Sequence, residues 1–306
     1  ELLVLDDGWF GKRDSDKSSL GDWVADRRKL PGGLDGLARR VRRTGMQFGL
    51  WMEPEMVSSD SDLYRSHPDW CLHVPEKKPE HTFRQRNQLV LDFSRADVCD
   101  AVTEMITRVL CSAPISYVKW DMNRPHTDVG SAALPPERQG EVAHRFQLGL
   151  YRVMETVTSR FPDVLWEGCA GGGGRFDPGI LYYMPQIWTS DDTDGVERLK
   201  IQYGTSLVYP AGAMSAHVSA SPNQQVGRET PLGFRAAVAM AGNFGYELDL
   251  TGLSAADKAA IRGQIACYRR AADLVREGDL YRLRSPFAGN LAAWMFVSPD
   301  RRQALV

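Results

Sequence analysis

The chain has 306 residues, which is enough for one large α/β domain built around a single core. Hydrophobic residues make up 43% of the sequence and charged residues 25%, a balance typical of globular proteins that excludes a disordered chain. The formal net charge is −2 with acidic and basic residues interspersed, which excludes the basic surface that nucleic acid or anionic lipid would need.

The five cysteines are far apart in the sequence, which predicts free thiols rather than a disulfide framework. No apolar run approaches the roughly 20 residues that span a bilayer. We therefore expect a cytoplasmic protein with neither a membrane nor a nucleic acid as a partner. The chain opens on Glu1 and runs directly into the apolar pattern LLVLDDGWF, without an initiator Met or a charged leader. We expect it to be a piece of a longer protein.

Short β-rich runs alternate with helical patterns along the chain, which predicts parallel strands joined by helices. The predicted strands are Leu2–Asp7, Phe48–Glu53, Leu89–Phe93, Tyr117–Asn123, Leu165–Cys169, Ile187–Asp191, Met214–Val218 and Asn243–Leu250. Apolar residues at helical spacing predict helices over residues 34–43, 96–110, 141–161, 196–209 and 256–277.

Polar residues follow nearly every predicted strand, as in DD after LLVL, EPE after GLWM and DMN after YVKW. An open doubly wound sheet concentrates function at one switch point, whereas a ring of polar strand ends is typical of a (β/α)8 TIM barrel. We therefore expect an α/β fold with a catalytic barrel over residues 1–279. The segment 280–306 has short β patterns and no helix, which predicts the beginning of a C-terminal all-β domain, cut short at the chain end.

The segment YVKWDMNR carries the strongest local signal for chemistry. Side chains alternate along a strand, so Lys119, Asp121 and Asn123 are expected on one face. An ammonium group beside a carboxylate favours its ionised form, which suits a nucleophile. The alternative is an ion pair that closes the strand end.

Two further segments follow predicted strands. Residues 166–177, WEGCAGGGGRFD, contain four consecutive glycines, which allow a close approach of the backbone to a ligand, and Cys169 is either a buried structural thiol or a weak hydrogen-bond partner. A phosphate loop is the rival interpretation, but the GxxxxGK[ST] pattern is absent. Residues 186–195, QIWTSDDTDG, contain Asp191, Asp192 and Asp194, of which the last two could simply cap a helix.

Other residues indicate a sugar ligand without a metal. Trp9, Trp51, Trp120 and Trp188 fall at strand ends, where they either pack in the core or form an exposed rim for the apolar face of a pyranose. The pair Asp6 and Asp7 could accept two adjacent hydroxyls. The calcium-loop spacing, HExxH and Cys/His zinc patterns are all absent, so neither a metal nor a cofactor is expected.

Together, LDDGWFGKR, GLWMEPEMV, RNQLVLDFS, YVKWDMNR, EGCAGGGGRFD, WTSDDTD and GNFGYELDL resemble the α-galactosidases of glycoside hydrolase family 36, in order along nearly the whole chain. The resemblance implies a (β/α)8 barrel between two β-domains, in which the DDGWF strand is the second and the first lies upstream of Glu1. It also implies that Leu89–Phe93 is not a barrel strand.

The resemblance further implies roles for individual residues. Asp121 would be the nucleophile and Asp191 the acid/base of a retaining hydrolysis of terminal α-linked galactose from melibiose and raffinose-series sugars. The galactose pocket would comprise Asp6, Asp7, Trp51, Arg86, Lys119, Asn123, Cys169 and Gly172. A thiol at Cys169, near the sugar 2-position, suits a free hydroxyl and disfavours an N-acetylgalactosaminidase.

The type of activity, the oligomeric state and the independent activity of this piece stay open at this point. A raffinose-synthase type galactosyltransferase would use the same chemistry with a sugar as acceptor, and an inactive galactoside-binding fragment would use none. The resemblance implies a homo-oligomer, a tetramer, for the full-length protein. In the family an N-terminal domain contributes to the pocket, so independent activity of this piece is an open question.

Overall fold

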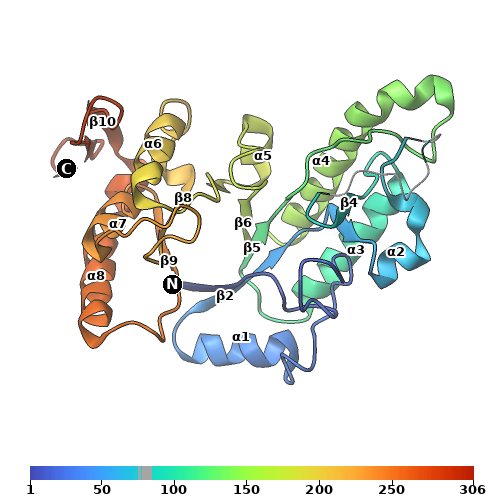
Figure 1. The fold of residues 1–306 in the computed structure, drawn as a ribbon, viewed down its shortest axis with the longest axis horizontal. Coiled ribbons are helices and arrows are strands. Elements are labelled where there is room, and N and C mark those ends of the chain that lie inside the picture. The colour runs from blue at the N-terminus through green and yellow to red at the C-terminus, as the bar shows by residue number, and fades with distance from the viewer. Residues whose placement is uncertain (75–76, 78–84) are drawn as a thin grey trace. The chain divides into compact units, whose positions relative to one another are not determined.

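The computed structural model describes residues 1–306 except residues 75–76 and 78–84 (Figure 1). The described chain divides into two compact units. The first comprises Glu1–Gly171 with Tyr182–Met184, and the second comprises Gly172–Leu181 with Pro185–Val306. Each unit combines parallel strands with helices.

Parallel strands form the centre of the first unit, in the order β1-β2-β5-β6. The apolar side chains of β2 and β5 are buried, as Phe48, Leu50 and Val118 show. Leu50 pairs with Val118 and Trp51 with Lys119, so the carboxyl ends of β2 and β5 lie side by side. The strand bounds are β1 Leu2–Leu5, β2 Gln47–Met52, β5 Tyr117–Trp120 and β6 Leu165–Gly168.

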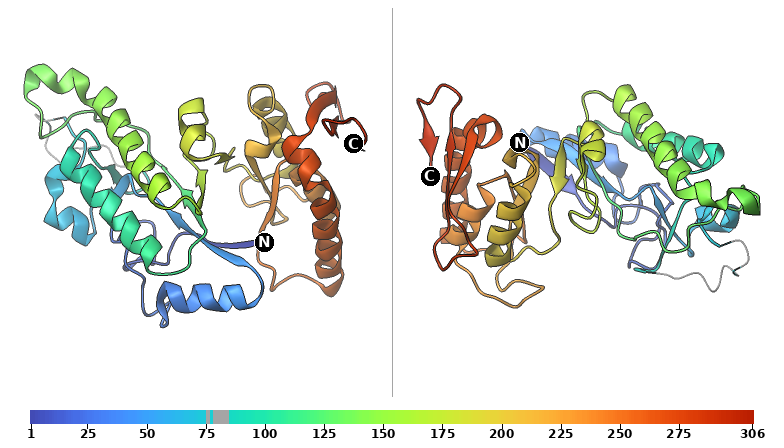
Figure 2. Two further views of the ribbon diagram at one scale, coloured as in Figure 1. Left: turned by 180° about the vertical axis from the view of Figure 1, so that it is seen from behind. Right: turned by 90° about the horizontal axis from the view of Figure 1, so that it is seen from above.

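Helices α3 and α4 run side by side in this unit (Figures 1 and 2). Their close approach depends on Gly149 of α4, because a Cβ atom there would lie 1.9 Å from the carbonyl oxygen of Phe93, just before α3, and 3.0 Å from Cys99 Sγ in α3. The helices of the unit are α1 Gly33–Arg43, α2 Asp62–Ser66, α3 Ala96–Cys111 and α4 Val142–Arg160, with 3₁₀ turns η1 Pro68–Trp70 and η3 Pro136–Glu141.

A separate antiparallel pair joins β3 (Met56–Ser58) to β4 (Gln88–Val90). Of the predicted strand Leu89–Phe93, only Leu89 and Val90 lie in β4. These two residues pair with β3, outside the parallel set.

The second unit contains the parallel strands β7 (Gln186–Trp188), β8 (Met214–Ser219) and β9 (Asn243–Glu247). Its core includes Met214 and Val275. The helices are α6 Gly195–Thr205, α7 Leu232–Ala239 and α8 Ala255–Glu277, with the 3₁₀ turn η4 Ala211–Ala213. The short helix α5, Pro178–Tyr183, includes residues of both units.

Three antiparallel strands follow α8: β10 (Asp279–Arg284), β11 (Ala293–Val297) and β12 (Ala304–Leu305). Phe296 from β11 is buried in the same core cluster as Met214. The proposed domain boundary between residues 279 and 280 stays a prediction.

The α/β class is thus confirmed, with parallel strands and separate antiparallel sheets.

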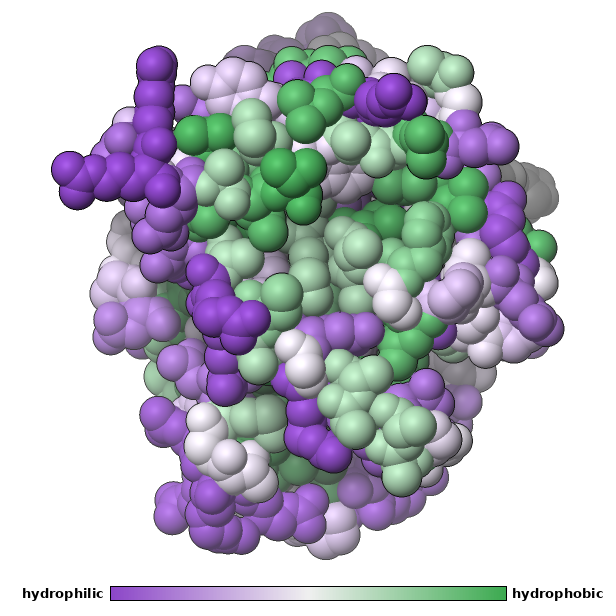
Figure 3. Space-filling view, turned by 90° about the vertical axis from the view of Figure 1, so that its left-hand side faces the viewer, coloured by the Kyte–Doolittle hydropathy of each residue, from purple (hydrophilic) through white to green (hydrophobic). Residues whose placement is uncertain are grey.

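One face, shown in Figure 3, carries hydrophobic side chains across its middle and hydrophilic ones around them. Exposed apolar residues of the second unit include Leu207, Val208, Leu283, Phe287 and Leu291, so its apolar residues are not confined to its core.

Among the described residues, no helix has both the length and the apolar character needed to cross a membrane. All five cysteines are free, as the sequence predicts.

Candidate active site

Asp121 follows the last residue of β5, beside the end of β2. Its backbone N–H donates to the carbonyl oxygen of Met52 at 2.8 Å, which continues the parallel hydrogen bonding by one residue. The side chain is only 6% exposed. The strand pairing therefore places this carboxylate among the residues that end β2.

Three N–H groups donate to the Asp121 carboxylate. Oδ2 accepts from Trp51 Nε1 at 3.0 Å and from Asn123 Nδ2 at 2.6 Å, and Oδ1 accepts from the backbone N–H of Met122 at 2.8 Å. Trp51 comes from β2 and the other two donors from the loop that carries Asp121. The carboxylate is held in one orientation, as a nucleophile requires.

Lys119 lies two residues before Asp121 along the chain, and its Nζ atom is 3.6 Å from Asp6 Oδ2. Burial opposes the charged form of Lys119, but the negative charge of Asp6, and after it those of Glu167 and Asp121, raise its pKa above the usual range. The ammonium group is therefore a fixed positive charge in this cluster. Buried Cys169 belongs to the same cluster through β6, since its N–H donates to the carbonyl oxygen of Trp120 at 2.8 Å.

The remaining predicted binding residues of this unit lie nearer to solvent. Asp7 makes an ion pair of 2.9 Å with Arg13, whose side chain is almost fully buried. Arg86 is exposed and has a φ of 52°. Its positive charge acts on the nearby buried Glu53.

Asp191 lies in the second unit, after β7. Its Oδ1 atom accepts from Trp188 Nε1 at 3.0 Å, and its carbonyl oxygen accepts from the side chain of Gln225. The Arg198 guanidinium lies 4.5 Å and the His217 ring 4.7 Å from the centre of the Trp188 ring. Asp191 is thus oriented by a buried indole that packs against these two groups.

Arg198 is almost fully buried, and burial lowers its pKa to about 10. Its guanidinium donates to the carbonyl oxygens of Ser190 at 3.1 Å and Ser215 at 2.7 Å. Arg198 therefore connects the segment before Asp191 to β8.

The glycine run packs directly against this segment. Gly172 has a φ of +85°, and a Cβ atom on it would lie 2.7 Å from Ser190 Cα and 2.8 Å from Asp191 N. A Cβ atom on Gly173 would lie 2.5 Å from the carbonyl oxygen of Thr189. The glycines are needed for a close approach of two backbone segments, whether or not they also face a ligand.

The other two acids of this segment have structural roles. Asp194 is the N-cap of α6 and accepts from the N–H groups of Val196 at 3.0 Å and Glu197 at 3.1 Å. Asp192 accepts from the N–H of Asp194 at 3.0 Å. The capping interpretation is confirmed for Asp194.

The four strand-end tryptophans do not form an exposed rim, so that alternative was wrong and packing was right. They are buried because each indole N–H satisfies a polar group below the surface. Their acceptors are Trp51 O for Trp9, Asp121 for Trp51, Glu55 for Trp120 and Asp191 for Trp188.

The first unit therefore brings Trp51 and Asn123 to Asp121, and Asp6, Cys169 and Asp121 to the neighbourhood of Lys119. The second brings Gly172 to Asp191. The sequence interpretation missed several buried charged groups, namely Glu53, Glu55, Glu167 and Arg198. The EPE segment after GLWM was the available signal for the first two.

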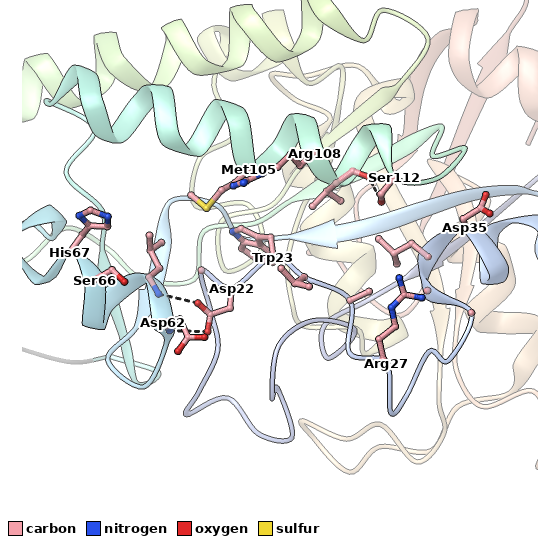
Figure 4. Close-up of a pocket in the computed structure, with 18 residues that line it drawn as sticks. Asp22, Trp23, Arg27, Asp35, Asp62, Ser66, His67, Met105, Arg108 and Ser112 are labelled. Atoms are coloured by element: carbon pink, nitrogen blue, oxygen red, sulfur yellow. Dashed lines mark hydrogen bonds between the residues drawn. The ribbon is translucent and has the colours of Figure 1, made fainter.

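Among the described residues, no group of three or more His, Cys, Asp or Glu side chains could hold a metal ion. A cavity of about 590 Å³ opens in the first unit between α1, α3 and the preceding loop (Figure 4). There Asp22 accepts from the N–H groups of Asp62 and Leu63, and Trp23 and Arg108 line the wall. None of the predicted site residues lines this cavity.

Known proteins similar to this chain were found by sequence and by structure. The chain is 66% identical over its whole length to α-galactosidase AgaA of Geobacillus stearothermophilus and covers 42% of it. It is 55% identical over its whole length to α-galactosidase 1 of Pediococcus pentosaceus and covers 41% of it. The chain thus spans about two fifths of the length of these curated relatives.

Solved structures of α-galactosidases are also similar to this chain. A family-36 AgaA variant from Geobacillus stearothermophilus in complex with raffinose matches 99% of this chain with a TM-score of 0.97 and 66% identity, over 42% of that chain. The α-galactosidase of Lactobacillus brevis matches 99% of this chain with a TM-score of 0.96 and 49% identity, over 41% of that chain. The model of the melibiase family matches residues 1–278. The chain belongs to the melibiase family.

Proposed function

We propose that this chain carries the active site of a retaining α-galactosidase, with Asp121 as nucleophile and Asp191 as acid/base. The observation that carries the proposal is the setting of Asp121. Three N–H donors orient its carboxylate, and the Lys119 ammonium group belongs to the same cluster. The names of the relatives, all α-galactosidases, support the substrate class.

We propose in addition that the parallel strands of the two units are consecutive strands of one (β/α)8 barrel. The ends of β5 and β7 would then meet at the same rim, where the active sites of such barrels lie. The high structural similarity to solved family-36 enzymes supports this arrangement. Retention requires the two carboxyl groups to stand about 5–5.5 Å apart, whereas inversion requires about 6.5–9.5 Å.

The reaction has two steps. Asp121 attacks the anomeric carbon, and Asp191 gives its proton to the leaving oxygen. Asp191 then takes a proton from water, which attacks the galactosyl-enzyme from the same face that the leaving group left. Galactose is released with its configuration retained and without a cofactor.

The proposed substrates are melibiose and raffinose-series oligosaccharides. AgaA variants in which one or the other of two aspartates is replaced were crystallised with raffinose and with stachyose. The two replaced aspartates lie as far apart in that sequence as Asp121 and Asp191 lie in this one. This correspondence supports both the pair of residues and the class of sugar.

The pocket proposed for galactose comprises the predicted binding residues. Asp6 and Asp7 would accept from the distal hydroxyls, Lys119 and Asn123 would donate, and Cys169 would face the 2-hydroxyl. Trp51, Arg86 and Gly172 complete the proposed set. We also keep, as predictions, a cytoplasmic location and a tetramer of the full-length protein.

Hydrolysis of p-nitrophenyl α-galactoside by the full-length protein tests the function, with NMR to follow the anomer first released. We expect α-galactose as the first product. β-Galactose would contradict retention, and dominant transfer to excess raffinose over hydrolysis would identify a transferase instead. Failure of the folded protein to turn over any α-galactoside would leave only a binding role.

A further inference from the structure

Glu53 is a buried acid that the mechanism above does not use. It directly follows β2 and its side chain is fully buried. Oε1 accepts from the backbone N–H of Asn123 at 2.5 Å, and Oε2 accepts from Gln88 Nε2 at 2.9 Å. One carboxyl group therefore joins the end of β2 to β4 and to the loop after β5.

Asn123 connects Glu53 to the nucleophile. The backbone of Asn123 is held by Glu53, while its side chain donates to Asp121 Oδ2 at 2.6 Å. Asn123 can contact both Glu53 and Asp121 because the parallel pairing of β2 with β5 places the ends of the two strands together. A shift of the Asn123 backbone would move one of the three donors that orient Asp121.

The charges around Glu53 determine whether the protonated or the ionised form of its carboxyl group fits the site. Burial and, after it, the negative charge of Asp121 raise the pKa of Glu53 to about 8, while hydrogen bonds from Asn123 and, after them, the positive charge of Arg86 oppose this rise. A protonated Glu53 still satisfies both partners. Oε1 accepts from Asn123, and the amide of Gln88, turned by half a rotation, accepts the proton from Oε2.

We propose that Glu53 is a positioning residue for Asp121, because its carboxyl group fixes the Asn123 backbone and so one of the donors that orient Asp121. Beside the negative charge of Asp121, the uncharged form of Glu53 fits this position best. This role rests on the proposed function, because it concerns the same nucleophile. It makes two demands on residue 53: an oxygen acceptor toward Asn123 and no charge.

Two substitutions in the full-length protein separate these demands. Glu53→Gln keeps the acceptor without the charge, and Glu53→Leu removes both. On p-nitrophenyl α-galactoside at pH 6 we expect Glu53→Gln to keep kcat within about threefold of the wild type. Glu53→Leu should lower kcat by about 10- to 100-fold with little change in KM, the scale expected when a buried N–H loses its acceptor.

Glu55 provides the matched control. It is equally buried, lies two residues away and accepts from Trp120 Nε1 at 2.7 Å. Glu55→Leu should lower the Tm as much as Glu53→Leu does while changing kcat by less than about threefold, because the Trp120 indole that donates to Glu55 is not among the three donors that orient the Asp121 carboxylate. An equal loss of kcat in both Leu variants would reduce Glu53 to a general structural role and overturn the proposal.

The pH profile provides a readout that a structural role would not change. The ratio of kcat of Glu53→Gln to that of the wild type should rise as the pH passes about 8, where the wild-type acid ionises. The contribution of Asp191 cancels in this ratio. A ratio that stays flat, or a Glu53→Gln variant as slow as Glu53→Leu, overturns the proposal while a wild type that hydrolyses the substrate preserves the proposed function. A folded wild type without hydrolysis overturns both.

Discussion

At the scale of single residues, Trp51 supplies one of the donors that orient Asp121. Replacement by Phe removes this N–H and keeps most of the ring. A hydrogen bond to a charged group contributes about 1.5–3 kcal/mol, so we expect kcat to fall by about 10- to 100-fold. Steady-state kinetics on a nitrophenyl galactoside measure this loss.

Trp120→Phe is the control for this variant, because Trp120 is equally buried and donates to a carboxylate, that of Glu55, outside the proposed pocket. We expect both variants to lose Tm but only Trp51→Phe to lose most of its kcat. Equal kinetics in the two variants would show that the Trp51 N–H has no special role toward Asp121.

The role of Asp191 predicts a dependence on the leaving group. General acid catalysis contributes about 10²–10⁴-fold when the leaving oxygen needs a proton. Asp191→Asn should therefore lose far more of its kcat/KM on raffinose than on p-nitrophenyl α-galactoside, since nitrophenolate leaves unaided and kcat/KM does not include the later attack of water. Steady-state kinetics of the variant and the wild type on each of the two substrates test this. An equal loss of kcat/KM on both would argue against an acid role.

At this scale the position after a strand, beside Lys119, singled out Asp121, whereas the choice of Asp191 among three neighbouring acids came from the family resemblance. It did not predict Glu53, because a glutamate beside a proline looks the same in a sequence whether it is buried or exposed. The partners of Glu53 lie 35 and 70 residues away, which no local pattern reports.

At the scale of elements, the glycine loop holds the segment of Asp191. Gly172→Ala would force an L-residue into a φ of +85° and bring its Cβ atom to 2.7 Å from Ser190 Cα. We expect a lower Tm together with a large loss of kcat, because the backbone at Asp191 has to move. Thermal unfolding and kinetics of the one variant measure both effects.

Gly171→Ala is the matched control. Its φ is also positive, +53°, but nothing lies within 4 Å of the added Cβ atom. The expected cost is the conformational strain alone, about 1–2 kcal/mol. If the two variants behave alike, the close approach to Ser190 is not what constrains the loop.

The long elements were predictable because each has a strong apolar period, as α1, α3, α4 and α8 show. The short helix α7 was missed, since its sequence LGFRAAVA offers only two turns and small side chains. The strand at Leu89–Phe93 was recognised as extended, but its antiparallel partner β3 is only three residues long. Pairing is a tertiary property that an apolar run does not specify.

At the scale of the whole molecule, Glu53 makes stability depend on pH. Its folded pKa of about 8 lies above the ordinary value of 4.5, so between these pH values the folded state holds a proton that the unfolded state has lost. The free energy of unfolding should therefore fall, from this group, by up to about 1.4 kcal/mol per unit as the pH rises from 4.5 toward 8. Denaturant unfolding at several pH values measures this slope.

Glu53→Gln is the comparison that isolates this contribution from other titrating groups. The variant has no proton to lose, so its stability should gain on that of the wild type as the pH rises through this window. Parallel stability curves for the two proteins would mean that Glu53 ionises in the folded state as it does in the unfolded one.

The central claim is that Asp121 forms the covalent bond to galactose. Trapping of the full-length protein with a fluorinated galactosyl donor, followed by peptide mapping, tests it most directly. We predict a single labelled peptide, modified at Asp121 within YVKWDMNR. A label on any other residue would contradict the assignment.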